Sequence, residues 1–186
     1  MRVAGLLLAA GAGRRFGLPK ALVSRDGALW VDTTSGVLRD AGCAPVVVVL
    51  GAAAAEVRAA ATLTGVTTVH NTAWETGMGS SLRVGLSALA DRADAVVVLP
   101  VDTPGITPAA VRRFHALATR TALARASYSG VPGHPVLLGA DHWPAVVEAA
   151  TGDAGARDYL RDHRATTVPC EDVADGADVD RPEDLP

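Results

Sequence analysis

Residues 6–22 read LLLAAGAGRRFGLPKAL. In this stretch an apolar run ends in a turn of small residues, and two arginines, a glycine and the pair Pro19–Lys20 follow. Lys20 is the only lysine of a chain that has 16 arginines. An ammonium is a compact point charge and a guanidinium a planar fork, so arginine does not replace lysine at every site. Lys20 is therefore a candidate functional residue, with chance in an arginine-rich composition as the alternative.

The glycines of this stretch indicate a loop that can wrap a phosphate, because glycine lets backbone N–H groups approach a ligand closely. They are Gly11, Gly13 and Gly17. The loop is not a P-loop, which has glycine, lysine and a hydroxyl residue in succession, since Leu18 and Pro19 stand before Lys20. It also lacks the dinucleotide fingerprint GxGxxG, since Phe16 occupies the place of the third glycine. The second failure disfavours a nicotinamide-dependent dehydrogenase.

Apolar runs alternate with segments of helical length along the chain. The runs are continuous and rich in valine, which is typical of parallel strands that are covered on both faces. We predict strands at Val3–Ala9, Val46–Leu50, Val66–His70 and Ala95–Leu99, and helices at Val31–Ala41, Ala53–Ala61, Ser80–Ala90 and Pro108–Thr119. This alternation predicts an α/β fold of three layers with a mostly parallel central sheet.

The second half of the chain gives fewer signals. Thr107 before Pro108 is a strong start signal for a helix. A further helical region is expected within Gly139–His163, with Asp141 as its N-cap, and the acidic tail Glu171–Pro186 is expected to be irregular. No repeat or low-complexity linker divides the sequence, so we expect one domain over residues 1–186.

The composition limits the partners of the protein. The formal net charge is −3, which provides no basic surface for nucleic acid. The longest apolar runs are too short to span a bilayer. The N-terminal apolar run is followed by arginines rather than by the small residues of a cleavage site. We therefore expect a cytoplasmic protein that binds neither nucleic acid nor membrane.

The glycine loop resembles the nucleotidyltransferase signature LxxGxGxRxGxxK, from Leu8 to Lys20. The rest of the chain resembles the family that holds the molybdenum cofactor cytidylyltransferases, and it departs from common family residues at Phe16 and Thr103. The matching segments follow in the right order: Gly77–Leu86, Leu99–Thr107, Gly133–Leu138, Gly152–Arg157 and Asp178–Leu185. The resemblance implies a Rossmann-like, GT-A-type nucleotidyltransferase fold.

The same resemblance implies how a nucleoside triphosphate binds, because in the family the glycine backbone wraps the triphosphate and an arginine and a lysine bind its phosphates. The expected nucleotide-binding residues are Leu8, Ala9, Ala10, Gly11, Gly13, Arg15 and Lys20. Arg15 and Lys20 are also expected to be catalytic, since they would stabilise charge during the transfer. Relatives that use guanine commonly have glycine where Ala10 stands, so the methyl group of Ala10 favours CTP over GTP.

Three aspartates are candidate metal ligands. Asp102 follows an apolar strand, where a carboxylate can hold Mg²⁺ against phosphate oxygens. Family members use the matching aspartate in this way, so we expect Asp102 to be a catalytic metal ligand, with a turn residue as the alternative. Asp180 is the first choice for a second ligand and Asp178 the other candidate, in a tail that is acidic throughout.

Two further sites are candidates for substrate contacts. Ser80 and Ser81 follow Gly79 at the start of a predicted helix, where free N–H groups can bind an anion. Contact of these three residues with the nucleotide and simple capping by Ser80 are equally good readings. His134 lies in a Gly-His-Pro turn, and we expect it to bind the acceptor, with bracing of the turn as the alternative.

The sequence thus predicts an enzyme that moves CMP from CTP onto the phosphate of a small acceptor, with Mg²⁺ as cofactor and pyrophosphate as the second product. By resemblance the acceptor is molybdopterin carrying molybdenum, and a molybdoenzyme would receive the product. One alternative is a guanylyltransferase of the same fold that uses GTP with molybdopterin or another phosphorylated metabolite. The other is a non-catalytic nucleotide-binding protein that delivers the cofactor, against which Arg15, Lys20 and Asp102 argue.

Overall fold

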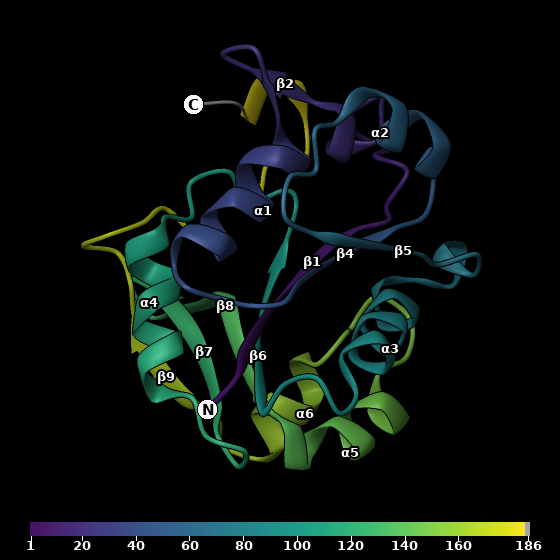
Figure 1. Cartoon of the computed structure of the whole chain (residues 1–186). Helices are drawn as coiled ribbons and strands as arrows, with labels where there is room; N and C mark the ends of the chain where they lie inside the picture. The colour runs from purple at the N-terminus through teal and green to yellow at the C-terminus, as the bar shows by residue number, and fades with distance from the viewer. Residues whose placement is uncertain (185–186) are drawn as a thin grey trace.

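A seven-stranded sheet runs through the middle of the computed structural model, which describes residues 1–184, and helices cover both faces of this sheet (Figure 1). The strands are β1 (Val3–Ala9), β4 (Val46–Leu50), β5 (Thr67–His70), β6 (Ala95–Pro100), β7 (Leu123–Tyr128), β8 (Val131–Gly139) and β9 (Thr166–Pro169). Their order across the sheet is β5-β4-β1-β6-β8-β7-β9. Only β8 is antiparallel to its neighbours β6 and β7, and the other pairs are parallel. The predicted α/β fold with a mostly parallel central sheet is confirmed.

The side chains of the central strands divide the core into two halves. In β1, Leu7 packs into the half that includes residues of α1 (Trp30–Asp40), α2 (Ala54–Ala60) and α4 (Pro108–Leu117). Its neighbours Leu6 and Leu8 pack into the other half with α3 (Met78–Leu89), α5 (Trp143–Ala149) and α6 (Arg157–Asp162). Successive strand residues point to opposite faces, so a continuous apolar run supplies both halves.

The remaining elements are short. A two-stranded hairpin, β2 (Ser24–Arg25) with β3 (Ala28–Leu29), precedes α1. Single turns of 3₁₀ helix occur at η1 (Lys20–Leu22), η2 (Trp74–Thr76), η3 (Ala140–His142) and η4 (Pro182–Asp184). Within residues 1–184, no helix is both long and apolar enough to cross a membrane.

The predicted elements agree with the structure to within one or two residues in the first 120 positions. Thr107 caps α4 as predicted, because its Oγ1 accepts a hydrogen bond from the Ala110 N–H at 3.3 Å. The N-cap predicted at Asp141 is wrong. Asp141 lies inside η3 and its carboxylate accepts a hydrogen bond from Arg120 at 2.9 Å, while α5 begins two residues later without a side-chain cap.

The order of the strands places two loops beside each other. β1 and β6 are parallel neighbours, so the loop after β1 and the loop after β6 emerge from the same edge of the sheet. Ligands of open α/β sheets bind at this carboxyl edge. The acidic tail comes to the same place. Residues 171 to 181 form no helix or strand, as predicted, whereas the 3₁₀ turn η4 departs from the irregular tail that the sequence predicts. Leu185, which ends the predicted tail motif, lies with Pro186 outside the described residues.

Candidate active site

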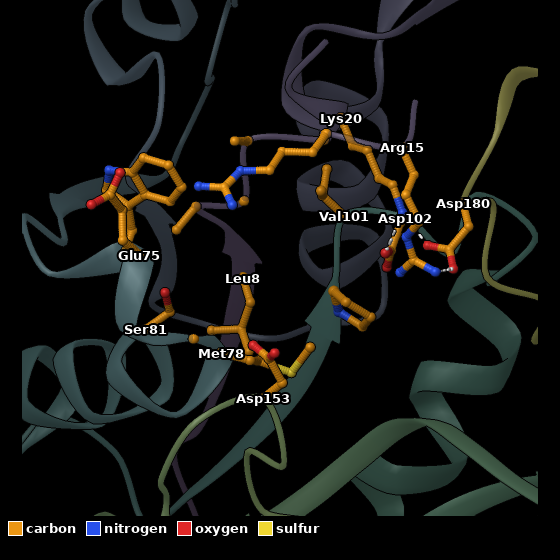
Figure 2. A pocket seen from close by; sticks show the side chains of 18 residues that line it. Leu8, Arg15, Lys20, Glu75, Met78, Ser81, Val101, Asp102, Asp153 and Asp180 are labelled. Carbon is orange, nitrogen blue, oxygen red and sulfur yellow. Dashed lines mark hydrogen bonds and ion pairs between the residues drawn. The ribbon is translucent and has the colours of Figure 1, made fainter. Parts of the chain in front are cut away.

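A cavity of about 380 Å³ opens at the carboxyl edge of the sheet, between the loop after β1 and the start of α3. One part of its wall carries the charged side chains of Arg15, Lys20, Asp102 and Asp180, and Glu75, Ser81, Met78 and Asp153 line the other side (Figure 2). The cavity therefore joins the glycine loop, the loop after β6, the tail and the α3 start, which are far apart in the sequence.

The glycine loop is held in a shape that only glycine fits well at position 13. Gly13 has a φ of +61°, and a Cβ at this position would lie 1.8 Å from the carbonyl oxygen of Leu18. The Gly13 carbonyl in turn accepts hydrogen bonds from the N–H groups of Phe16 and Gly17 at 2.9 and 2.8 Å. At Gly11 a Cβ would meet nothing within 4 Å, so there the backbone faces open space at the cavity. The tight turn at Gly13 brings Arg15 and Lys20 back toward the end of β1.

Four charged side chains, Arg15, Lys20, Asp102 and Asp180, form a group that we call the ionic cluster. The Lys20 Nζ donates hydrogen bonds to Asp102 Oδ2 and to Asp180 Oδ1, both at 2.8 Å. Arg15 Nη1 lies 2.9 Å from the other carboxylate oxygen of Asp180. The Lys20 side chain is only 13% exposed, whereas that of Arg15 is 70% exposed. Lys20 is thus the inner cation of the cluster and Arg15 the outer one.

The contacts of the cluster shift the protonation of its members. Partial burial acts to lower the pKa of Lys20, but the hydrogen bonds and charges of Asp102 and Asp180 outweigh it and raise this pKa above its ordinary value. The hydrogen bond from Lys20 lowers the pKa of Asp180, and burial opposes this effect. Both side chains are therefore charged at neutral pH.

Backbone contacts bring the tail beside the loop after β6. The N–H of Val179 donates to the carbonyl of Asp102 at 2.9 Å, and the N–H of Asp175 donates to the carbonyl of Gly105 at 3.1 Å. Between these two bonds, the Tyr128 ring lies so close to Gly176 that a Cβ there would approach it to 2.0 Å. The tail is thus fixed in register with Asp102, which places Asp180 on the cluster.

Asp178 has a different environment from Asp180. It does not line the cavity, and the residue as a whole is exposed. Burial of its carboxyl group, with repulsion by the charges of Asp102 and Asp180, raises the pKa of Asp178 above its usual range. Of the two candidates for a second metal ligand, Asp180 is the one that shares a cation with Asp102.

His134 lies near the cluster without lining the cavity. The residue as a whole is partly exposed, yet burial of the imidazole lowers the pKa of His134 to about 4, against the opposing charge of Asp102. Its carbonyl accepts a hydrogen bond from the Tyr128 hydroxyl at 2.8 Å. The prediction of a turn here is wrong, because Gly133, His134 and Pro135 lie within β8, and this bond braces that part of the strand.

The start of α3 uses most of its polar groups inside the fold. Asn71 Nδ2 donates to Ser80 Oγ at 2.7 Å and to Ser81 Oγ at 3.0 Å, and Ser80 Oγ donates to the Gly77 carbonyl at 2.8 Å. The Gly79 N–H donates to the Gly152 carbonyl at 2.8 Å, and a Cβ on Gly79 would lie 2.8 Å from the backbone of residue 150. Of the three predicted contacts at this helix start, Ser81 lines the cavity, whereas Gly79 and Ser80 do not.

The structure also places the residues before the loop. Leu8 and Ala10 line the cavity, while the Ala9 side chain packs into the core on the opposite face of the sheet. The methyl group of Ala10 is nearly buried beside Gly51, where an added Cβ would come within 2.8 Å of it. Contact with a nucleotide at Ala9 would therefore be made by its backbone.

Sequence reasoning missed several lining residues: Arg14, Trp74, Glu75, Met78 and Asp153. Arg14, Met78 and Asp153 lie within segments that carry the family resemblance, but none of the five has a residue type or spacing that predicts a contact. The feature of the sequence that could have indicated Arg14 is its place in the glycine loop. For Asp153 it is its place in the segment GDAGAR.

The oxygen donors of the ionic cluster fit a divalent cation. Among the described residues, no three side chains of His, Cys, Asp or Glu gather closely enough to hold a metal by themselves. Mg²⁺ does not need such a cage, because it takes one or two carboxylates and completes its shell with phosphate oxygens and water. Asp102 and Asp180 already share one cation, the Lys20 ammonium, so their oxygens converge as a pair of metal ligands must.

Comparison with known proteins gives consistent results over nearly the whole chain. Residues 5–167 match the MobA-like NTP transferase domain. A protein of Paenarthrobacter nicotinovorans named nicotine blue oxidoreductase is 38% identical over an alignment of 193 positions. The alignment covers 98% of this chain and 94% of that protein.

Two solved structures extend the comparison. The crystal structure of Rv0371c from Mycobacterium tuberculosis H37Rv has a TM-score of 0.85 at 29% identity and covers 99% of this chain and 95% of its own; Rv0371c has also been solved as a complex with manganese. A nucleotidyl transferase from Methanothermobacter thermautotroptrophicus has a TM-score of 0.78 at 22% identity, covers 90% of this chain and 87% of its own, and therefore shares the fold.

Proposed function

Because the chain belongs to the MobA-like NTP transferase family, a family of nucleotidyltransferases, we propose that it transfers CMP from CTP to the phosphate of molybdenum-carrying molybdopterin. Pyrophosphate is the second product. The observation that carries this proposal is the ionic cluster, which lies at the same cavity as the glycine loop. The protein is proposed to act as one domain over residues 1–186 and in the cytoplasm.

The reaction needs positioning and charge stabilisation rather than a general base. An oxygen of the acceptor phosphate is already ionised at neutral pH; it attacks the α-phosphorus of CTP, and the bond between that phosphorus and the bridging oxygen of the leaving pyrophosphate breaks. Lys20 and Arg15 would bind the phosphates and stabilise the charge that develops on them. The backbone at Gly11 and Gly13, with Leu8, Ala9 and Ala10, would hold the triphosphate and the nucleoside along the loop.

Asp102 and Asp180 are the proposed ligands of Mg²⁺, with Asp178 as the reserve candidate for the second position. When bound, the metal would supply positive charge to the phosphate oxygens. The manganese complex of Rv0371c supports a divalent metal in this group of proteins. Ser81 is the proposed nucleotide contact at the α3 start, and His134 the proposed acceptor contact, while Gly79 and Ser80 would support the nucleotide site through the shape of that turn.

The proposed preference for CTP over GTP rests on the Ala10 methyl group at the cavity wall, which would leave less room for a purine than glycine would. A guanylyltransferase is the closest alternative, and it differs only in the base. A non-catalytic delivery protein that passes the nucleotide-bound cofactor to a molybdoenzyme would need no metal-binding carboxylates beside its lysine. The ionic cluster therefore favours the enzyme.

The name of the curated relative gives a second candidate from another class, an oxidoreductase activity. The identity of 38% over nearly the full length makes this candidate specific enough to test. In this chain the dinucleotide fingerprint fails at Phe16, and the acidic ribose-binding residue is missing after β4, where Gly51 and Ala52 follow. These departures favour nucleotidyl transfer.

Pyrophosphate release tests the proposal against both alternatives. The protein is incubated with each of the four nucleoside triphosphates, with Mg²⁺ and with or without molybdopterin, and pyrophosphate is measured. We expect release that depends on CTP, metal and acceptor together. Release with GTP alone among the nucleotides would establish the guanylyltransferase. Absence of release, combined with oxidation of NADH or NADPH by a quinoid dye in a parallel assay, would establish the oxidoreductase instead.

A further inference from the structure

The inner cation of the ionic cluster occupies the place that the proposed function assigns to a metal ion. Lys20 Nζ lies 2.8 Å from one oxygen of Asp102 and 2.8 Å from one oxygen of Asp180 (Figure 2). We propose that Lys20 acts as a placeholder that competes with the divalent metal for these carboxylates and leaves them when a triphosphate arrives. This inference rests on the proposed function and concerns how metal and nucleotide are admitted to the same site.

The geometry of the cluster makes the competition direct. The Lys20 side chain is 13% exposed and those of Asp102 and Asp180 are 25% and 36% exposed, so the ammonium sits on the inner side of both carboxylates. A small divalent ion binds carboxylate oxygens at shorter range than an ammonium does, and it needs the same oxygens. The metal and the ammonium therefore cannot both bind the pair in this way.

The charges of the cluster explain why the metal alone is disfavoured. Arg15 and Lys20 balance Asp102 and Asp180, so the four side chains carry no net charge. A divalent ion that entered alone would displace the Lys20 ammonium from the carboxylates and leave it unpaired beside the metal ion. A triphosphate that entered alone would bring several negative charges to the two carboxylates. When both enter together, the ammonium gains phosphate oxygens as partners and the carboxylates gain the metal.

The chain is built so that Lys20 can make this exchange. Its four-carbon stem has freely rotating bonds, unlike the planar end of an arginine. It stands at the first residue of η1, and the glycine loop beside it lines the cavity where the phosphates are proposed to bind. Binding of metal and triphosphate is then cooperative, and the coupling is the same whichever of the two binds first. This role gives a second reason for a lysine at position 20.

The test measures binding of Mn²⁺ alone, without nucleotide, by the electron paramagnetic resonance signal of the free ion. Wild type is compared with Lys20→Met, Arg15→Met and the control Arg14→Met. Arg14 lines the same cavity and, within residues 1–184, forms no ion pair, so its replacement removes a nearby charge without freeing a carboxylate. Each variant is first checked for folding by its thermal unfolding, and Lys20→Ala replaces Lys20→Met if the latter does not fold.

We expect Lys20→Met to lower the Mn²⁺ dissociation constant by about tenfold or more, the size expected when a competing charged hydrogen bond is removed. Arg15→Met should increase the Mn²⁺ affinity less, because Arg15 pairs with Asp180 Oδ2 and not with the oxygens that bind Lys20. Arg14→Met should stay close to wild type, and adding Asp102→Asn to Lys20→Met should abolish the gain.

Two results would overturn the proposal in distinguishable ways. Equal Mn²⁺ affinity in wild type and Lys20→Met, in both cases lost with Asp102→Asn, would remove the placeholder role and leave the proposed function intact. Failure of wild type and Lys20→Met alike to bind Mn²⁺, with or without CTP, would remove the metal site itself and with it the metal-dependent reaction.

Discussion

The glycine loop and the start of α3 face each other across one cavity, and both carry a pattern typical of a phosphate site. At the loop, the charged groups of Arg15 and Lys20 have, among residues 1–184, only Asp102 and Asp180 as bonding partners, and these are themselves candidates for ligand binding. At the α3 start, the polar groups are bonded to backbone and to Asn71. The difference teaches that a polar motif indicates a ligand site only where the fold leaves its donors without a permanent structural partner.

The largest expected effect on activity comes from removing the carboxylates on the loop side of the cavity. Asp102→Asn keeps the shape of the side chain but removes its charge, so kcat/KM for CTP should fall roughly 100-fold or more. Asp180→Ala should lower kcat/KM to a similar extent. Asp178→Ala should lower it less, because Asp178 does not line the cavity. Steady-state pyrophosphate release measures all three.

The relative loss of activity in Asp178→Ala and Asp180→Ala decides which of the two aspartates is the second metal ligand. A larger loss for Asp178→Ala than for Asp180→Ala would assign the second metal position to Asp178. Wild-type activity in Asp102→Asn would contradict the metal site at the loop side altogether.

A smaller but distinct effect is expected when Lys20 keeps its charge and changes its shape. In Lys20→Arg the longer, planar guanidinium cannot take the place of a compact ammonium between Asp102 and Asp180, and later among the phosphate oxygens. We expect kcat/KM to fall at least tenfold, with the thermal unfolding temperature little changed. Arg15→Lys is the matched control and should lose less, since the Arg15 side chain is largely exposed and has one partner. Unimpaired turnover in Lys20→Arg would make the sole lysine an accident of composition.

The two serines at the α3 start should respond differently, Ser80 in stability and Ser81 in substrate binding. Ser80→Ala removes a buried hydroxyl that bonds to Asn71 and to the Gly77 carbonyl, so the free energy of unfolding should fall by about 1–2 kcal/mol. Ser81→Ala should instead raise the KM for CTP, because Ser81 lines the cavity. Urea unfolding and steady-state kinetics of both variants check this division. A raised KM without loss of stability in Ser80→Ala would make Ser80 a ligand contact.

Much of the fold follows from the sequence where the chain is uniformly apolar. The apolar runs predict the bounds of β1 and β4, because each is continuous and too short for a typical helix. The missed strands β7, β8 and β9 lack this signal. β8 contains two prolines and two glycines, residues that elsewhere mark turns, and its first half is exposed or only partly buried, so only its second half is apolar throughout.

The site divides in a similar way. The spacing of the glycine loop locates Arg15 and Lys20. The apolar run of β6, which ends just before Asp102, locates that aspartate. The partner that completes the cluster, Asp180, is 160 positions from Lys20, and the sequence alone cannot rank it above Asp178 by physical argument. The distinction arises from the hydrogen bond between Val179 and Asp102, a long-range contact that no local pattern encodes.

The smallest expected effect concerns the base. Ala10→Gly removes one methyl group from the cavity wall, so the preference for CTP over GTP should narrow by a few-fold, within the ~1–3 kcal/mol typical of one methyl-sized contact. The methyl group is nearly buried beside Gly51, which places the effect at the lower end of that range. The ratio of kcat/KM values for the two nucleotides measures it. An unchanged ratio would move base selection to the α3 side of the cavity.

The most direct test of triphosphate binding at the ionic cluster is the shift in thermal unfolding temperature that CTP causes at constant Mg²⁺. A ligand that binds only the folded state raises this temperature. We expect a clear upward shift for wild type and for Ser80→Ala, and almost none for Lys20→Met. An equal shift in wild type and Lys20→Met would contradict it, because CTP would then bind without the residue around which the site is built.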